Sequence, residues 1–252
     1  MEDLKLSDEY SEEYTLPSKG LVYSEKINPN IKIRSMTTRD EIKRLGHSTS
    51  EYKKLAEVID DCLIVKPGIP TYDLVIGDYQ FLLHKLRIVT YGSGYKTSPT
   101  CPYCGRVHEE TLDLQSLPVT ELSTSDLTNL NITLPTTKHK LELRMQTPRM
   151  LDEVRSKTND FIKRHPDTVG DTAFLYTLMS VIAKVDGEVL DDIRLEAFVN
   201  KLPMNDSNYI LQKLNKIQLG IDPKVSGHCP HCGKDFEYIF PITGEFFGPT
   251  VD

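Results

Sequence analysis

The chain has 252 residues, of which 38% are apolar and 27% are charged, and it contains no tryptophan. This composition is typical of a soluble globular protein and excludes a peptide scaffold, a fibrous chain or a largely disordered one. The formal charge of −7 disfavours broad binding to phosphate backbones or anionic lipid. No apolar run approaches the roughly 18 residues that span a bilayer, and the acidic start differs from a signal peptide. We therefore expect a cytosolic protein with neither nucleic acid nor a membrane among its partners.

The first part of the chain predicts an arm followed by a strand and three helices. Residues 1–15 are rich in Glu, Asp, Ser and Tyr, which indicates an acidic, flexible N-terminal arm. Residues 16–100 are expected to form one unit, beginning with a half-buried strand around Ile31 and Ile33. Its helices are predicted by caps and apolar periodicity: one after Thr37 or Thr38, one after Ser50, and a longer one from about Asp73 to Thr90.

The rest of the chain predicts two cysteine-bearing segments that flank a helical insert. Residues 101–146 hold the first cysteine pair and a β-hairpin, whose alternating runs cover 130–134 and 141–145. Residues 147–220 predict the insert, with helices from Pro148, from Phe174 to Val185, and around 193–202 and 209–219. Gly220 is expected to end the last helix in the left-handed conformation. Residues 221–252 hold the second cysteine pair and a C-terminal strand over 236–242.

Four of the five cysteines occur in two segments with one spelling. These are Cys101-Pro-Tyr-Cys104-Gly and Cys229-Pro-His-Cys232-Gly, whereas Cys62 stands alone in an apolar helical stretch, where we expect it to pack. In a cytosolic chain such cysteines indicate metal ligands or thiols rather than a disulfide framework.

The paired spacing predicts one structural zinc site made of all four cysteines. Each Cys-x-x-Cys turn directs two thiolates at one ion, and the glycine that follows tolerates the positive φ which this turn needs. Structural zinc takes four ligands, so the two pairs should meet, although the 124 residues 105–228 separate them. We place His108, His228 and His231, which lie near the pairs, outside the ligand set. The alternative at this point is a metal-free site with four free thiols.

Two other functions share the same cysteine spelling. Cys229-Pro-His-Cys232 is also the pattern of an oxidising thiol-disulfide oxidoreductase, in which the first cysteine begins a helix; here alternating aromatics after Gly233 predict a strand instead. Zinc-ribbon proteins also bind nucleic acid, but acidic residues offset the basic ones around both pairs. The sequence contains no P-loop, no Gly-x-Ser-x-Gly and no His-Glu-x-x-His. We therefore interpret the chain as a non-enzymatic interaction protein.

Several short motifs, taken in their order along the chain, resemble a known family. The motifs are Leu16-Pro-Ser-Lys-Gly20, Ile33-Arg34-Ser35-Met36-Thr37-Thr38-Arg39-Asp40-Glu41, Gly77-Asp78-Tyr79, Leu86-Arg87, Tyr91-Gly92, both Cys-Pro-x-Cys-Gly segments, Gly220-Ile221 and Phe246-Phe247-Gly248-Pro249. In this order they resemble the baseplate hub and hub-assembly proteins of T4-like tailed bacteriophages. The resemblance implies a role without catalysis in building the central hub of the baseplate, as a hub subunit or as an assembly factor or chaperone.

The resemblance also implies partners and a location. The partners would be other baseplate hub proteins or the tail tape-measure protein, met in the host cytoplasm during assembly, and the protein would also occur in the virion baseplate if it is retained there. We further expect the acidic arm and the aromatic end at Phe246 and Phe247 to bind partner phage proteins. The alternative for these two phenylalanines is that they close the core.

Together these observations predict a mainly helical α+β protein. In this prediction the helical insert is bracketed by two zinc-knuckle β-hairpins, which join into one four-cysteine, zinc-ribbon-like subdomain.

Overall fold

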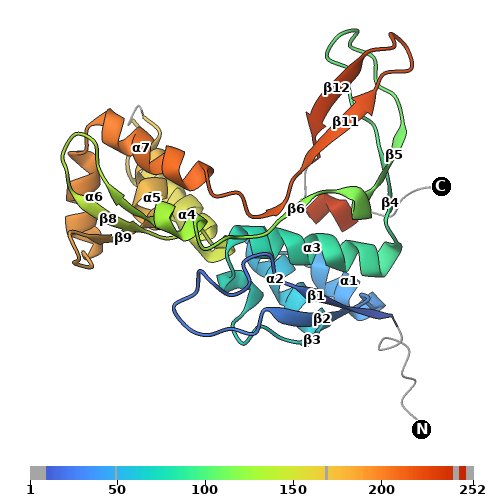
Figure 1. Ribbon diagram of the computed structural model, residues 1–252, viewed down its shortest axis with the longest axis horizontal. Coiled ribbons are helices and arrows are strands. Elements are labelled where there is room, and N and C mark those ends of the chain that lie inside the picture. The colour runs from blue at the N-terminus through green and yellow to red at the C-terminus, as the bar shows by residue number, and fades with distance from the viewer. Residues whose placement is uncertain (1–9, 49, 168–169, 241–243, 248–252) are drawn as a thin grey trace.

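The computed structural model describes residues 10–48, 50–167, 170–240 and 244–247. Figure 1 shows three parts: an N-terminal lobe around α3, an insert lobe at the left, and a narrow arm of β-hairpins at the upper right. The described residues form seven α-helices and several small antiparallel sheets, so the architecture is mixed α/β. No helix in these ranges is long and apolar enough to cross a membrane.

The N-terminal lobe packs three helices against a three-stranded antiparallel sheet of order β1-β2-β3. Its elements are β1 (Ser11–Thr15), β2 (Asn30–Arg34), α1 (Thr38–Leu45), α2 (Glu51–Cys62), β3 (Leu63–Val65), the 3₁₀ turn η1 (Thr71–Asp73) and α3 (Ile76–Tyr91). The predicted caps are confirmed: the Thr37 side chain accepts from the Asp40 amide in a capping box, and the Ser50 hydroxyl accepts from the Lys53 amide. The long helix begins at Ile76 rather than near Asp73, because the residues after Pro70 form η1.

The expectation of an arm over residues 1–15 is wrong for its last part. Ser11–Thr15 forms β1, which pairs with all five residues of β2, and the Tyr14 ring packs edge-on against Phe81. Pairing with β2 gives the backbone N–H and C=O groups of this polar segment hydrogen-bond partners. The composition of the segment does not reveal this pairing. Residues 1–9 of the predicted arm lie outside the described residues.

The insert lobe has its own hydrophobic core, built from a three-stranded sheet of order β7-β8-β9 and four helices. Its elements are η3 (Asp126–Leu130), β7 (Asn131–Thr133), β8 (Lys140–Leu143), α4 (Pro148–Arg164), α5 (Thr172–Val181), β9 (Ile182–Val185), α6 (Asp192–Asn200) and α7 (Met204–Asn215). The predicted hairpin is confirmed as β7 and β8. It packs with the helices of the insert, so the predicted boundary at residue 147 does not separate two cores.

Two predictions about the insert helices are wrong. The segment predicted as helical up to Val185 changes at Ile182 into β9, because β8 offers it an antiparallel partner and the β-branched Ile182 and Val185 favour a strand. Gly220 has the predicted positive φ of 96°, but α7 ends at Asn215 and Gly220 lies in β10. Its conformation serves a close approach of backbones to Gly77 and not a helix end.

The insert joins the N-terminal lobe through a short two-stranded neck. The chain leaves through β6 (Val119–Thr120) and returns through β10 (Gly220–Ile221), and these two strands pair antiparallel. Beside the neck the Ile76 amide donates to the Gln146 carbonyl at 2.9 Å, and Arg149 forms an ion pair with Asp73. The two segments that connect the insert to the N-terminal lobe therefore lie paired beside the start of α3.

The arm at the upper right of Figure 1 consists of two β-hairpins from distant parts of the chain. Its strands are β4 (Gly94–Thr97), β5 (Glu110–Asp113), β11 (Lys224–His228) and β12 (Asp235–Ile239), and η2 (Leu114–Ser116) follows β5. The predicted C-terminal strand is thus confirmed for 236–239, and its end at 241–242 lies outside the described residues.

The aromatic end of the chain lies in the N-terminal core. Phe246 and Phe247 belong to the 3₁₀ turn η4 (Gly244–Phe247) and are each only 1% exposed. The Phe246 ring stacks on His84, and its carbonyl accepts from Arg87 Nε at 3.1 Å. This burial removes the exposed position on which the docking interpretation of these two residues rested, and it agrees with their alternative role of closing the core.

Candidate metal centre

The two cysteine pairs occupy the tips of the two hairpins of the arm. The first tip connects β4 to β5 and the second connects β11 to β12, each across an antiparallel ladder. Antiparallel pairing brings the two ends of each hairpin together, so each Cys-Pro-x-Cys turn is held at the end of a closed ladder. Figure 1 shows the two tips side by side at the far end of the arm.

Both tips have the same backbone hydrogen bonds. In the first, the Cys101 amide donates to the Arg106 carbonyl and the Gly105 amide donates to the Cys101 carbonyl, both at 2.9 Å. In the second, the corresponding bonds join Cys229 to Lys234 and Gly233 to Cys229. Gly105 and Gly233 have φ values of 71° and 69°, a left-handed conformation that side chains rarely adopt. The common spelling therefore gives one common local geometry.

The four sulfurs meet in one cluster, in which all lie within 4.8 Å of one another. Cys101 Sγ lies 3.7 Å from Cys232 Sγ, and Cys104 Sγ lies 3.7 Å from Cys229 Sγ. These separations are far above a disulfide bond length of about 2.05 Å. Four sulfurs placed tetrahedrally at about 2.3 Å from an ion would lie about 3.8 Å apart. The cluster therefore has the ligand type and spacing of a four-thiolate metal site.

No histidine belongs to this cluster in the described part of the chain. His108 is buried beside it, packs edge-on against Phe236 and lies 3.5 Å from Glu110. His228 points its Nδ1 at Asp235 at 2.6 Å. Placing the neighbouring histidines outside the ligand set agrees with this arrangement.

The pKa values of two of the clustered thiols, Cys229 and Cys232, are shifted in opposite directions. The pKa of Cys229 is lowered to about 6, because backbone amides of Cys232 and His231 that donate to the thiolate outweigh the opposing effect of burial. The pKa of Cys232 is raised to about 11, because burial and the neighbouring sulfurs outweigh the amide of Lys234. Four thiolates so close together repel one another, and a cation between them removes that repulsion.

A pair of residues below the sulfurs, Tyr238 and Glu110, links the two hairpins. The Tyr238 hydroxyl on β12 donates to the Glu110 carboxylate on β5. Burial and this carboxylate raise the pKa of Tyr238 well above its usual value, so the phenol stays protonated and remains a donor. The alternation of aromatics on β12 indicated a strand but not this contact, because the partner is more than a hundred residues away.

The fifth cysteine lies elsewhere. Cys62 ends α2, is buried in the core of the N-terminal lobe, and has its pKa raised to about 12 by burial. A thiol in this state is a poor ligand and a poor nucleophile, which agrees with the packing role expected for it.

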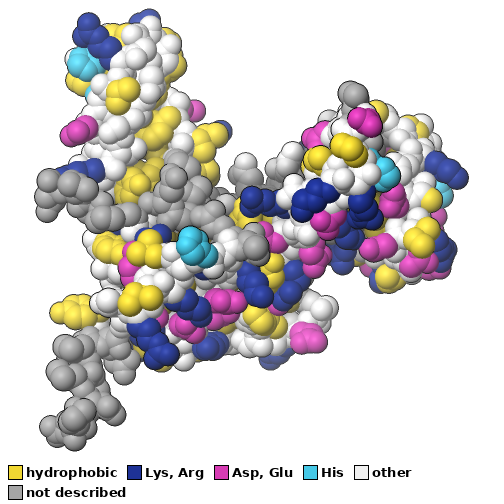
Figure 2. Space-filling view, turned by 180° about the vertical axis from the view of Figure 1, so that it is seen from behind, with side chains coloured by type: hydrophobic (Ala, Val, Ile, Leu, Met, Phe, Trp, Pro, Cys, Tyr) yellow, Lys and Arg dark blue, Asp and Glu magenta, His cyan; other side chains and the backbone are white. Residues whose placement is uncertain are grey.

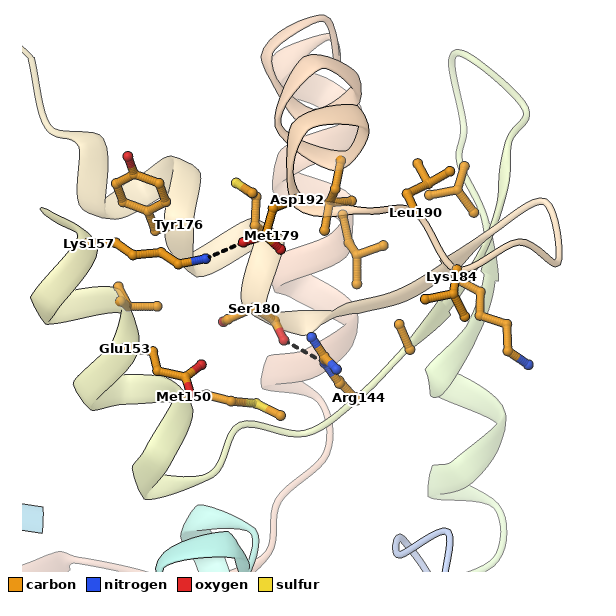
Figure 3. A pocket seen from close by; sticks show the side chains of 16 residues that line it. Arg144, Met150, Glu153, Lys157, Tyr176, Met179, Ser180, Lys184, Leu190 and Asp192 are labelled. Carbon is orange, nitrogen blue, oxygen red and sulfur yellow. Dashed lines mark hydrogen bonds and ion pairs between the residues drawn. The ribbon is translucent and has the colours of Figure 1, made fainter. Parts of the chain in front are cut away.

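A second concave site lies in the insert lobe, between α4, α5, β9 and the start of α6 (Figure 3). Its volume is about 160 Å³, and Met150, Met179 and Leu190 supply apolar lining. Lys157 is held by Asp192 at 2.9 Å, and Arg144 Nε donates to the Ser180 carbonyl at 2.8 Å. With these groups engaged, the recess is a weaker candidate for chemistry than the cysteine cluster.

The fold and the cluster define a class of protein: a mixed α/β chain in which two remote hairpins share a site suited to a structural metal ion. The chain belongs to the family described as T4 bacteriophage base plate protein, whose model matches residues 8–248. The predicted resemblance to T4-like baseplate proteins is therefore confirmed. Comparison with curated proteins and with solved structures finds no match. Membership assigns the protein to the base plate of a phage tail and implies contact with other base plate proteins.

Proposed function

We propose that Cys101, Cys104, Cys229 and Cys232 bind one structural zinc ion. The observation that carries this proposal is the convergence of two equivalent hairpin tips on one cluster of four sulfurs, with separations suited to a tetrahedral ion. Zinc is favoured because sulfur-only tetrahedral sites select zinc or iron–sulfur centres, and a single Cys₄ site with Cys-x-x-Cys spacing is typical of zinc.

Zinc would stabilise the outer part of the arm most, because few apolar side chains are buried there. Among the described residues, the hydrophobic cluster at its outer end contains Cys101, Cys229 and Phe236, with Tyr238 packed against it, whereas Tyr95, Leu112 and Val225 nearer its base pack on the core of the N-terminal lobe. Two-stranded hairpins are marginal in water without a larger core, and metal binding adds directly to the free energy of folding. Zinc would therefore join the hairpins at their tips, while the pair of Tyr238 and Glu110 joins them lower down.

Within the base plate, we propose a role without catalysis in assembly of the central hub, as a hub subunit or as an assembly factor. Membership of the family supports a location in the base plate. The three-part shape would allow contact with several neighbouring proteins at once (Figure 1). The proposed partners are other hub proteins or the tail tape-measure protein, met in the host cytoplasm before the tail is complete.

The structure favours this proposal over the redox alternative. A catalytic Cys-x-x-Cys pair has its first cysteine at the start of a helix. Here Cys229 follows β11 directly, and β12 begins at Asp235, three residues after Cys232. All four sulfurs also lie close enough to bind one ion, which would occupy the thiolates that an oxidoreductase needs. An insulin-reduction assay should show no activity above that of the Cys229→Ser variant.

Two experiments test the proposal separately. Metal analysis of the purified chain should give close to one zinc per chain, and a value near zero with four titratable thiols would reject the zinc site. Co-expression with each hub protein and with the tape-measure protein should give co-purification with at least one of them. Mass spectrometry of purified virions beside infected-cell lysate then distinguishes a retained hub subunit from an assembly factor that leaves. Absence of any complex would reject the hub role and leave the zinc result intact.

A further inference from the structure

We propose that Glu110, Tyr238 and Phe236 are positioning residues of the metal site, which hold the two hairpins of the arm at the spacing where the four sulfurs converge and thereby set the affinity for the ion. This inference rests on the proposed zinc site and extends it to residues outside the ligand set. We call the hydrogen bond between Glu110 and Tyr238 the clasp, since it joins β5 of the first hairpin to β12 of the second.

The outer part of the arm is supported mainly by contacts between its own two hairpins. Figure 2 shows the arm as a narrow projection that rises from the N-terminal lobe and stands clear of the insert lobe. The hairpins form two separate two-stranded sheets, β4-β5 and β11-β12. No backbone ladder joins these sheets in the described part of the chain, so side chains must fix how far apart the two tips lie.

The clasp provides a directional contact between the two hairpins. The Tyr238 hydroxyl donates to the Glu110 carboxylate, and the two residues are 128 positions apart in the chain. The contact is partly buried, which makes a hydrogen bond to a charged acceptor stronger than the same bond in open water. It therefore holds β5 and β12 in one relative position below the sulfurs.

Phe236 connects this contact to the sulfurs. Its ring centre lies 6.0 Å from that of Tyr238 on the same strand, and its ring packs with Cys101 and Cys229. The buried His108 ring of the first hairpin meets Phe236 edge-on, with ring centres 5.9 Å apart. The aromatic rings thus link the clasp to one cysteine of each pair.

Gly227 leaves room for these rings on β11. It lies opposite Phe236 in the ladder between β11 and β12. A Cβ atom at this position would lie 3.1 Å from Phe236 Cζ and 3.3 Å from Tyr238 Cε1, both tighter than ordinary van der Waals contact. Both rings therefore lie over the part of β11 that has no side chain, and a larger residue there would displace them.

These contacts reduce the ordering that metal binding must achieve. Hairpins that are already held together lose less conformational freedom when an ion joins their tips, and this smaller loss raises affinity. The affinity for zinc should therefore depend on the clasp, although neither of its residues belongs to the cluster of ligands.

The zinc affinity of the full chain, measured by competition with a chromophoric chelator, tests this proposal. Tyr238→Phe removes only the hydroxyl and Glu110→Ala removes its acceptor, so each should weaken zinc binding about tenfold, the contribution of one hydrogen bond to a charged group. The double variant should bind no more weakly than either single one, because both changes remove the same contact. Glu110→Gln keeps an oxygen that can accept from the phenol, and it should retain most of the affinity.

Two matched controls lie in the same arm. Tyr103→Phe removes a hydroxyl from the ring that Lys234 covers at the tip, and Glu109→Ala removes the exposed carboxylate next to Glu110. Neither group belongs to the clasp, so both variants should bind zinc as tightly as the parent.

Spectra separate a positioning role from general damage to the fold. With Co²⁺ in place of zinc, every variant should keep the absorption spectrum of the parent, because the four thiolates remain, and circular dichroism should show the helices intact. A Tyr238→Phe variant that binds zinc as tightly as the parent, or single losses that add in the double variant, would overturn the clasp and leave the zinc site standing. A parent chain that binds no zinc would overturn both.

Discussion

The crossing of the neck over α3 predicts a large effect from adding one methyl group. A Cβ atom at Gly77 would lie 2.5 Å from the Leu219 carbonyl oxygen and 3.0 Å from its carbonyl carbon. A Cβ atom at Gly220 would lie 2.7 Å from the Gly77 carbonyl oxygen. At Gly77 the Leu219 Cγ atom also lies 2.8 Å away, but the nearest obstructing atom in both cases is a backbone oxygen, so no side-chain rotation can relieve either contact. Gly77→Ala and Gly220→Ala should therefore force the neck away from the helix.

The loss in the free energy of unfolding has two contributions, steric overlap and backbone strain. Overpacking costs about 1–3 kcal/mol, and for Gly77→Ala a gain of less than about 1 kcal/mol in helix propensity opposes it. Gly220 also has a φ of 96°, which adds about 1–3 kcal/mol for a non-glycine residue. Because the 2.5 Å contact with a backbone oxygen places Gly77→Ala toward the upper end of the overpacking range, we expect a loss in the free energy of unfolding of about 1–3 kcal/mol for Gly77→Ala. For Gly220→Ala the two contributions add to about 2–6 kcal/mol.

Two other glycines supply controls for each contribution. Gly92 has a φ of 83° but open space around its Cβ position, so Gly92→Ala measures backbone strain alone. Gly94 has neither a positive φ nor a close neighbour, and Gly94→Ala should change stability by less than about 0.5 kcal/mol. Urea unfolding of the zinc-loaded chain, followed by circular dichroism, gives all four values. A Gly77→Ala variant as stable as the parent would show that the crossing is not tight.

Three further predictions concern the metal site, the buried histidine and the insert. Cys101→Ser and Cys232→Ser should each lower zinc content and melting temperature to the same extent, as chelation should, and unequal losses would contradict a shared site. Burial lowers the pKa of His84 from 6.5 to about 4, so the unfolded chain takes up the proton first, and stability should fall by up to about 3 kcal/mol as pH drops across this window. The free energy of unfolding is measured against pH for the parent and for His84→Gln, and the difference between the two curves cancels any effect of metal loss. Parallel curves would refute the assigned role of His84. Asp206→Ala should destabilise the insert by about 2–3 kcal/mol in urea unfolding, because its carboxylate accepts two amides and a hydroxyl from the β7–β8 turn, and an unchanged midpoint would contradict this.

The features predicted correctly are those whose cause is local in the chain. Thr37 and Ser50 cap helices because a side-chain oxygen reaches an amide three residues away. The convergence of the cysteine pairs was also predictable despite their distance, because each Cys-x-x-Cys turn offers half of a tetrahedral site and structural zinc takes four ligands. Each Cys-x-x-Cys turn alone would leave a zinc ion with only two ligands, and this shortfall predicted that the two turns meet.

The features predicted wrongly depend on partners far along the chain. Ser11–Thr15 is polar enough to suggest an arm, yet β2 converts it into a strand through backbone hydrogen bonds that any side chain permits. The apolar positions of Ile182–Val185 are compatible with either a helix or a strand, and the presence of β8 decided between them. From the sequence, Phe246 and Phe247 could equally form an exposed docking surface or fill the core. In the structure both are buried, and the Phe246 ring stacks on His84 of α3.

By itself the sequence determined the meeting of the two cysteine pairs, the caps of α1 and α2, the family and the absence of familiar catalytic motifs, because each depends on neighbouring residues or on their order. Only the tertiary structure decided which lobe each hairpin joins, where the backbone of the neck touches α3, and which side chains link the two hairpins of the arm. Burial and exposure are properties of the whole packed chain, since a side chain is covered by whichever segment folds against it and not by its neighbours in sequence.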